Sequence, residues 1–357
     1  MAFLKIPNVA IKGISACVPP GVEENRDIPF YSSEEAEKVI ESTGVERKHK
    51  VLNSGITALD LCLKASQKLM DDLQWEANSI DAVCYVTQTP DYINQPTGFV
   101  LHEKLGLSQD CMVIDLFHGC PGWVVGLSTI ASMMSHGTLK RVLFAVGDNI
   151  TSQQYPQDHE SRPLFGDAGS ATALEYDESA TPISFVIGTN SQDGVTLIRK
   201  KGAYRQPHTL ESFTQEMGLL SGELSTEGLD DNMDGMSVFS FGITIPPKSI
   251  KQLCEKNEID LAGIDKLVLH QANKFMINKI AKKLKVDAEK VPSCLKDYGN
   301  TTNSSIPLTI VTQCNRDYST KHIKTICCGF GTGLSWGTAY FETDKIVVPD
   351  VIIYENV

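Results

Sequence analysis

Residues 113–123 read Val113-Ile114-Asp115-Leu116-Phe117-His118-Gly119-Cys120-Pro121-Gly122-Trp123. The first half is typical of a strand. The run that follows, from Pro121 to Gly137, contains no Asp, Glu, Lys or Arg and predicts a helix buried on all sides. Because proline fits the first position of a helix, we expect Cys120 at the N-cap, where the helix dipole favours a thiolate. The stretch therefore predicts a nucleophilic cysteine, with a cysteine packed as a small apolar side chain as the alternative.

Composition limits the classes of protein that this chain can belong to. Its 357 residues provide core for one large or two ordinary domains, and its formal net charge of −12 argues against a general nucleic-acid surface. No apolar run reaches the roughly 18 residues of a membrane span, and no signal peptide is evident. The ten cysteines lack the spacing of zinc or redox motifs. We therefore expect thiols in a cytoplasmic protein and no metal site.

Two segments about half the chain apart resemble each other. One contains Ile80-Asp81 and the other Ile264-Asp265, each after a helix-like stretch and before a second helix that ends in Lys-Leu. Strands alternate with helices in both copies, which predicts α/β layers. Self-similarity at one large period predicts two duplicated halves, which we place at 1–180 and 181–357.

The duplication brings together three residues capable of chemistry. Cys120 corresponds to the segment 298–305, which contains Asn300, and His270 ends the Ile-Asp strand of the second half. Loops at such strand ends converge on a shared site. A Cys–His–Asn set serves papain-like hydrolysis, in which His deprotonates Cys, or thioester condensation, in which His and Asn hydrogen-bond an enolate. The residues alone leave both chemistries open.

The glycine-rich segment 329–333 is followed by residues that read as a strand, whereas a phosphate-binding loop needs a helix there. We expect a backbone loop that lends an N–H to an oxyanion. The Gly-x-Ser-x-Gly match at 333–337 does not predict a hydrolase, because no histidine follows residue 322.

Taken together, these motifs resemble the thiolase-fold condensing enzymes, specifically the 3-oxoacyl-acyl-carrier-protein synthase III (ketoacyl synthase III) family. The matching segments follow in family order at 43–47, 89–92, 119–122, 165–169, 233–239, 270–273, 298–302 and 329–337. The resemblance implies a five-layered αβαβα sandwich and a homodimer. It also implies that Cys120 accepts an acyl group from a primer thioester, while His270 and Asn300 hold the enolate of a decarboxylated malonyl thioester.

The resemblance also implies roles for residues outside the Cys–His–Asn set. The oxyanion would be held by backbone N–H groups of Cys120 and of the loop Gly331, Thr332 and Gly333. The substrate tunnel would include Phe165, Arg162 and Asn273. It implies no permanently bound cofactor, because the acyl-thioester of coenzyme A or of acyl-carrier protein is the substrate.

Departures from the family pattern favour a specialised relative in secondary or unusual lipid metabolism. Members that start fatty-acid chains hold a Trp and an Arg where this chain has Lys38 and Ser42. Acyl transfer to an oxygen or nitrogen acceptor is the alternative function. A non-catalytic scaffold subunit is less favoured, since it would need none of the three chemical residues.

The segment from Lys266 to Lys285 carries six lysines and no acidic residue. Met276, Ile280 and Leu284 recur at helical spacing and are expected to face the core. The lysines that remain outward either form a solvated helix face or, as the resemblance implies, a docking patch for an acidic acyl-carrier protein. The patch residues are Lys274, Lys279, Lys282 and Lys283.

Overall fold

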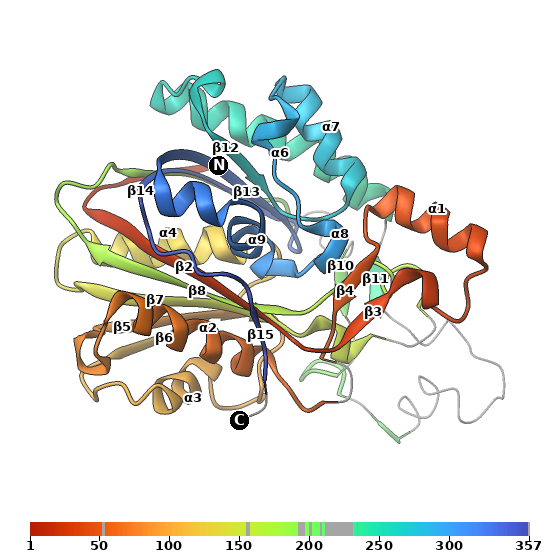
Figure 1. The fold of residues 1–357 in the computed structure, drawn as a ribbon, viewed down its shortest axis with the longest axis horizontal. Helices are drawn as coiled ribbons and strands as arrows, with labels where there is room; N and C mark the ends of the chain where they lie inside the picture. Colours follow the sequence, from red (N-terminus) through yellow and green to blue (C-terminus); the bar gives the residue numbers. More distant parts are fainter. Residues whose placement is uncertain are drawn as a thin grey trace.

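The computed structural model describes residues 1–51, 54–154, 158–191, 197–199, 202–207, 209–210, 231–233 and 235–355. Two β-sheets lie one above the other, with helices between them and helices on both outer faces (Figure 1). The fold is the predicted five-layered αβαβα sandwich. No helix in the described ranges is long and apolar enough to span a bilayer.

The six-stranded sheet belongs mainly to the first half of the chain. Strand β5 is parallel to both neighbours, β6 and β7, whereas β7 pairs with β8 and β8 with β2 in antiparallel fashion. The strands lie in the order β15 (Ile352–Ile353), β2 (Val9–Val18), β8 (Ala168–Tyr176), β7 (Arg141–Asp148), β5 (Ala82–Thr87) and β6 (Met112–Phe117).

The five-stranded sheet repeats this pattern with strands of the second half. β12 is parallel to β13, and the remaining pairs are antiparallel. The order is β1 (Ala2–Ile6), β9 (Ile183–Thr189), β14 (Ser335–Asp344), β13 (His322–Gly331) and β12 (Lys266–Leu269). The succession β9-β14-β13-β12 thus matches β2-β8-β7-β5, as expected of duplicated halves.

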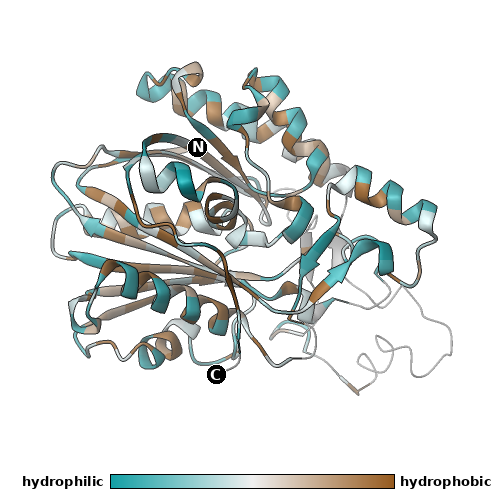
Figure 2. Cartoon of the chain, in the orientation of Figure 1, coloured by the Kyte–Doolittle hydropathy of each residue, from teal (hydrophilic) through white to brown (hydrophobic). Residues whose placement is uncertain are grey.

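Helices complete the layers (Figure 1). The two that lie between the sheets are α4 (Gly122–Met134), which is apolar on all sides as its sequence predicted, and α9 (Ser305–Thr320). The outer helices carry both hydrophilic and hydrophobic residues, because one face of each meets solvent (Figure 2). They are α2 (Ala58–Leu73) and α3 (Thr97–Lys104) on the six-stranded sheet, and α6 (Gly235–Asn257) and α7 (Lys274–Leu284) on the five-stranded sheet.

The two Ile-Asp anchors play the same structural part in each half. The Asp81 carboxylate accepts a hydrogen bond from the main-chain N–H of Arg141 at 2.9 Å, at the start of β7. The Asp265 carboxylate accepts one from the main-chain N–H of Lys324 at 2.8 Å, in β13. Each aspartate therefore aligns the parallel neighbour of its own strand, which explains why the sequence repeats there.

Short elements flank one end of the sandwich. They are α1 (Ser33–Thr43), α8 (Leu295–Tyr298), the ribbon of β3 (Val22–Glu24) with β4 (Arg47–His49), and the pair β10 (Leu197–Arg199) and β11 (Asp231–Met233). The predicted motif at 233–239 ends in α6, but its Asp234 lies outside the described residues.

The chain ends exchange sheets. β1 pairs with β9 in the sheet of the second half, and β15 pairs with β2 in the sheet of the first. The tail after Glu342, to which the sequence assigned no function, runs parallel to β2 along the edge of the six-stranded sheet. There the N–H of Ile14 donates to the carbonyl of Val347 at 2.9 Å. The division at residues 180 and 181 stays a prediction.

Candidate active site

Cys120 lies between β6 and α4, as the sequence predicted, but the helix begins one residue later than expected. Gly122 is the first helical residue and Pro121 takes the N-cap position. The N–H of Gly122 donates to the carbonyl of Gly119 at 2.7 Å, so a tight turn carries Cys120 into the helix. The cysteine therefore precedes the N-cap, and no side-chain hydrogen bond caps the helix.

The expectation of a thiolate at rest is wrong. Burial, together with the nearby Asp148 carboxylate, raises the pKa of the Cys120 thiol to about 12, although hydrogen bonds from the main chain of Thr332 and Cys120 oppose the rise. The residue still keeps partial contact with solvent. Near neutral pH Cys120 is accordingly a thiol, because the cost of placing a charge in this enclosed position exceeds the attraction of the helix terminus.

The glycine-rich loop packs directly against the thiol. A Cβ atom at Gly331 would lie 2.7 Å from Cys120 Sγ, so only glycine allows this approach. The Ser335 hydroxyl donates to the carbonyl of Thr332 at 2.6 Å and fixes the loop beyond this point. The structure thus brings together the predicted oxyanion groups, the main-chain N–H groups of Cys120 and Thr332.

His270 follows β12 and is 2 % exposed. Its Nδ1 lies 2.7 Å from the Ser305 hydroxyl at the start of α9, and its ring meets the Phe330 ring edge-on. Burial lowers the pKa of His270 to about 3, against a hydrogen bond with the backbone of Thr302. The imidazole is therefore neutral and can donate one hydrogen bond to a substrate.

Asn300 is held by its backbone beside Phe165, with which it forms a β-bridge. Its N–H donates to the carbonyl of Leu164 at 2.8 Å, and its carbonyl accepts from the N–H of Gly166 at 3.1 Å. The side-chain Oδ1 accepts from the N–H of Thr302 at 2.9 Å. The amide NH₂ is consequently the end that Asn300 can offer to a substrate.

The starts of α4 and α9 touch each other. A Cβ atom at Gly122 would lie 3.1 Å from the Cβ of Asn303, and the Asn303 amide donates to the carbonyl of His118 at 3.4 Å. His270 reaches the same place through Ser305. The three residues that the sequence selected therefore gather where the two enclosed helices begin.

Known proteins share this fold. Residues 114–191 match the family model for 3-oxoacyl-[acyl-carrier-protein] synthase III, and residues 254–343 match the model for its C-terminal part. The beta-ketoacyl-[acyl-carrier-protein] synthase III of Streptococcus gordonii is 30% identical over 346 residues, which cover 95% of this chain and 98% of the relative. The crystal structure of a 3-oxoacyl-(acyl-carrier protein) synthase from Burkholderia xenovorans superimposes with a TM-score of 0.90 at 32% identity and covers 99% of both chains.

The chain belongs to the 3-oxoacyl-acyl-carrier-protein synthase III family. It is therefore an enzyme, and the predicted family and fold are confirmed. The structure of a 3-oxoacyl-(acyl-carrier-protein) synthase III at 29% identity, with a TM-score of 0.85, covers 95% of this chain and all of its own. A condensing-enzyme family favours thioester chemistry over papain-like hydrolysis for the Cys–His–Asn set.

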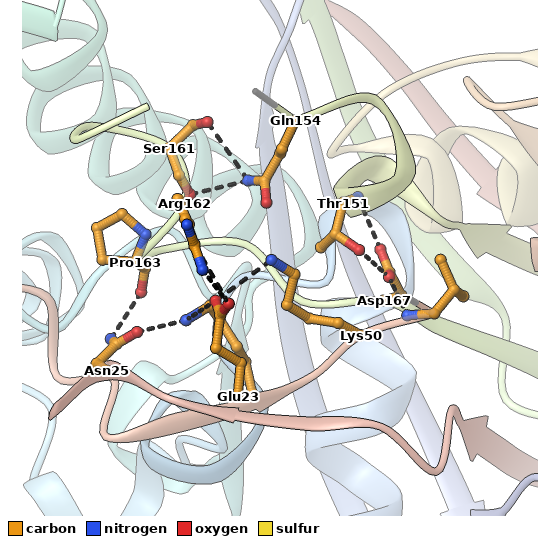
Figure 3. Close-up of polar contacts among 11 residues, drawn as sticks. Glu23, Asn25, Lys50, Thr151, Gln154, Ser161, Arg162, Pro163 and Asp167 are labelled. Atoms are coloured by element: carbon orange, nitrogen blue, oxygen red, sulfur yellow. Dashed lines mark hydrogen bonds and ion pairs between the residues drawn. The ribbon is translucent and has the colours of Figure 1, made fainter. Parts of the chain in front are cut away.

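The three residues predicted for the substrate tunnel of this synthase each contact a different part of the structure. Phe165 adjoins Asn300, as described above. Asn273 caps α7, since its side chain accepts from the N–H of Met276 at 2.8 Å. The guanidinium of Arg162 donates to the Glu23 carboxylate at 2.9 Å (Figure 3). Their roles toward substrate stay predictions.

Arg162 belongs to a buried ion cluster that the sequence did not predict. Figure 3 shows the Glu23 carboxylate with Lys50 and Arg162, and Lys48 lies 3.1 Å from it. Burial opposes ionisation of Glu23, but these cations lower its pKa to about 2. Burial in turn lowers the pKa of Lys48 to about 8. The cluster ties the β3–β4 ribbon to the segment that leads into Phe165.

The helix α7 of the synthase has the predicted faces. Met276, Ile280 and Leu284 are buried, as expected. The lysines of the proposed patch are exposed: Lys274, Lys279, Lys282 and Lys283. Two of them, Lys274 and Lys282, line a groove of about 580 Å³ between α1 and α7, with Ile40, Ile277 and Leu295 at its apolar floor.

Sequence reasoning missed three residues of the site. Ser305 was seen only as part of a segment, and neither Thr302 nor Asp148 received a role. Asp148 carried a signal, because it is an acidic residue that directly follows the uncharged run 142–147 of strand β7. A fully buried carboxylate needs hydrogen-bond donors, and such a need points to a polar site.

Proposed function

We propose that this synthase joins an acyl primer to a malonyl unit by decarboxylative condensation, with Cys120 as the acyl carrier. The observation that carries the proposal is the meeting of a thiol, a main-chain oxyanion loop and two neutral donors at the starts of α4 and α9. A neutral His270 and an oriented Asn300 amide suit an enolate, which needs hydrogen-bond donors and no proton acceptor.

In the first step Cys120 Sγ attacks the carbonyl carbon of the primer thioester. The N–H groups of Cys120 and Thr332 hold the oxyanion, the new S–C bond forms, and the bond to the departing thiol breaks. Because the pKa of Cys120 is about 12, its proton leaves only as the sulfur attacks, and it passes to the departing thiolate.

In the second step the malonyl thioester loses carbon dioxide as its carboxylate C–C bond breaks. His270 Nε2–H and the Asn300 amide stabilise the enolate oxygen. In this proposal the Ser305 hydroxyl, 2.7 Å from Nδ1, is the donor of that contact, so that the imidazole proton sits on Nε2 and faces the substrate. The enolate carbon attacks the acyl carbonyl, the ketone forms, and Cys120 leaves as a thiolate that takes a proton from water.

Acyl-adduct analysis tests the proposal. The protein is incubated with a series of acyl-coenzyme A primers, and its intact mass is measured. We expect one acyl adduct in the wild type and none in Cys120→Ala. His270→Ala should keep the adduct while it loses malonyl-coenzyme A decarboxylation by about a hundredfold. An adduct of equal yield in Cys120→Ala, or equal loss of both reactions in His270→Ala, contradicts the proposal.

The primer is also part of the proposal. At the positions where acetyl-primed members carry a Trp and an Arg, Lys38 pairs with Glu34 at 2.7 Å and the Ser42 hydroxyl donates to the carbonyl of Val39. Neither offers an aromatic surface or a planar cation to a nucleotide. We propose a specialised cytoplasmic enzyme that takes thioesters as substrates without a resident cofactor.

An acidic acyl-carrier protein is the partner that we propose for α7. The lysines at the rim of its apolar groove attract acidic side chains mainly during association, and salt weakens this attraction. Charge reversal at Lys279 and Lys282 should raise the KM for carrier-bound malonyl several-fold and leave the KM for malonyl-coenzyme A unchanged. Lys68→Glu on α2, on the opposite outer layer, is the matched control. Equal losses with both substrates would argue against carrier docking.

A homodimer is the assembly that we propose. β6 ends the six-stranded sheet, and although it is mostly apolar none of its residues is fully buried. Phe117 at its end is 79 % exposed. An apolar edge strand is a surface at which a second copy can pair.

A further inference from the structure

Asp148 is a fully buried carboxylate that the reaction steps above do not use. It ends β7, and its hydrogen-bond donors among the described residues are all neutral: the Thr87 hydroxyl at 3.0 Å, the Gln88 N–H at 2.8 Å and the Gln88 amide at 3.2 Å, with a further contact from Thr89. The fifth donor is the Thr302 hydroxyl, which comes from the other half of the molecule. Asp148 therefore connects β5 and β7 to the start of α9.

The Thr302 backbone has an unfavourable conformation, which the hydrogen bond to Asp148 helps to hold. Its φ of 49° lies in the left-handed region, which a β-branched residue rarely adopts. In this conformation its N–H points back to Asn300 and donates to Oδ1 at 2.9 Å. The hydroxyl of Thr302 and its N–H thus face two different partners, Asp148 on one side and Asn300 on the other.

We infer that Asp148 and Thr302 are positioning residues for Asn300: the carboxylate holds Thr302, and Thr302 holds the Asn300 amide with its NH₂ toward the substrate. The inference rests on the proposed role of Asn300 in holding an enolate. An amide can rotate and exchange its oxygen for its nitrogen, and the rotated form would present an acceptor to the enolate oxygen and repel it. The N–H of Thr302 selects the productive orientation.

The Asp148 carboxylate also affects Cys120, because it disfavours ionisation of the thiol. Its negative charge contributes to the high pKa of Cys120. Asp148→Asn removes this charge and should therefore make Cys120 easier to deprotonate. The same substitution should weaken the hold on Thr302, because the new NH₂ group would face the donors that now surround the carboxylate. A merely structural aspartate would weaken both reactions together.

The experiment compares Thr302→Val, Thr302→Ser and Asp148→Asn with the wild type. Decarboxylation of malonyl-coenzyme A is measured beside alkylation of Cys120 by iodoacetamide. For Thr302→Val we expect decarboxylation to fall on the order of tenfold to a hundredfold with alkylation within about twofold of wild type, and Thr302→Ser should restore decarboxylation. Asp148→Asn should slow decarboxylation and speed alkylation. Equal decarboxylation in Thr302→Val and the wild type overturns the inference, as does a parallel loss of both reactions.

Two further arms separate this inference from the proposed function. If Asn300→Ala decarboxylates malonyl-coenzyme A as the wild type does, the proposed role of Asn300 fails, whatever the Thr302 variants do. A crystal structure of Thr302→Val then still tests the positioning, because we expect the Asn300 side chain to leave its place, and an unmoved side chain contradicts us. Asp81→Asn is the matched control, since it removes a carboxylate from main-chain N–H groups at the opposite end of β5.

Discussion

The starts of α4 and α9 occupy equivalent positions in the two halves of the fold, but they carry different side chains. The first carries the thiol of Cys120, followed at once by Pro121 and Gly122. The second carries Asn300 and then a run of buried polar residues from Thr301 to Ser305. Each start rests on a strand of the other half, since Gly331 of β13 meets Cys120 and Asp148 of β7 holds Thr302. The fold thus provides two equivalent positions, and contacts across the halves place the glycine-rich loop against Cys120 at one of them and orient Asn300 at the other.

The largest difference expected between the two starts is in their response to pH. Alkylation of Cys120 by iodoacetamide should rise about tenfold per pH unit between roughly pH 7 and pH 10, because the thiol pKa of about 12 keeps the thiolate a minor species throughout. His270, with a pKa of about 3, should stay neutral over the same range. The rate is followed by intact mass, with Cys120→Ala as background. A plateau near neutral pH would mean that the helix terminus controls the thiol after all.

A substitution on the α4 side should have the next largest effect. In Gly331→Ala the new methyl group would lie 2.7 Å from Cys120 Sγ and push the thiol away from the oxyanion loop. We expect the rate of acyl-adduct formation to fall about a hundredfold. Gly106→Ala is the control, because no atom lies within 4 Å of its added Cβ and only the backbone strain remains. Adduct formation at the wild-type rate in Gly331→Ala would remove the loop from the site.

On the α9 side the expected effect is smaller and confined to one reaction. Ser305→Ala removes the partner of His270 Nδ1, so the proton is no longer held on Nε2. Malonyl-coenzyme A decarboxylation should fall about tenfold, with adduct formation unchanged. Ser304→Ala is the matched control: its hydroxyl donates to the carbonyl of Val146, and its loss should lower the free energy of unfolding by about 1 kcal/mol and spare decarboxylation. If both serine variants lose the same activity, Ser305 supports the fold and does not orient His270.

The layered fold and the identity of the three main residues could be predicted from the sequence because both depend on local patterns. The uncharged run after Pro121 indicates burial by itself, and the spacing of Met276, Ile280 and Leu284 indicates which face of α7 is covered. The repeated Ile-Asp anchors predicted the two halves, because each aspartate serves a neighbouring strand of its own sheet. The motifs, which follow one another in the order typical of the family, then identified the family.

Contacts between distant parts of the chain decided the rest. The sequence by itself determined the strand, the cysteine and the buried helix, but only the tertiary structure decided that the thiol stays protonated, since burial and the charge of Asp148 outweigh the helix dipole. Asp148 and Thr302 are 154 residues apart, and so no local pattern could join them. Hydrogen bonds and desolvation depend on what surrounds a group in space, whereas helix and strand patterns depend on near neighbours in the chain.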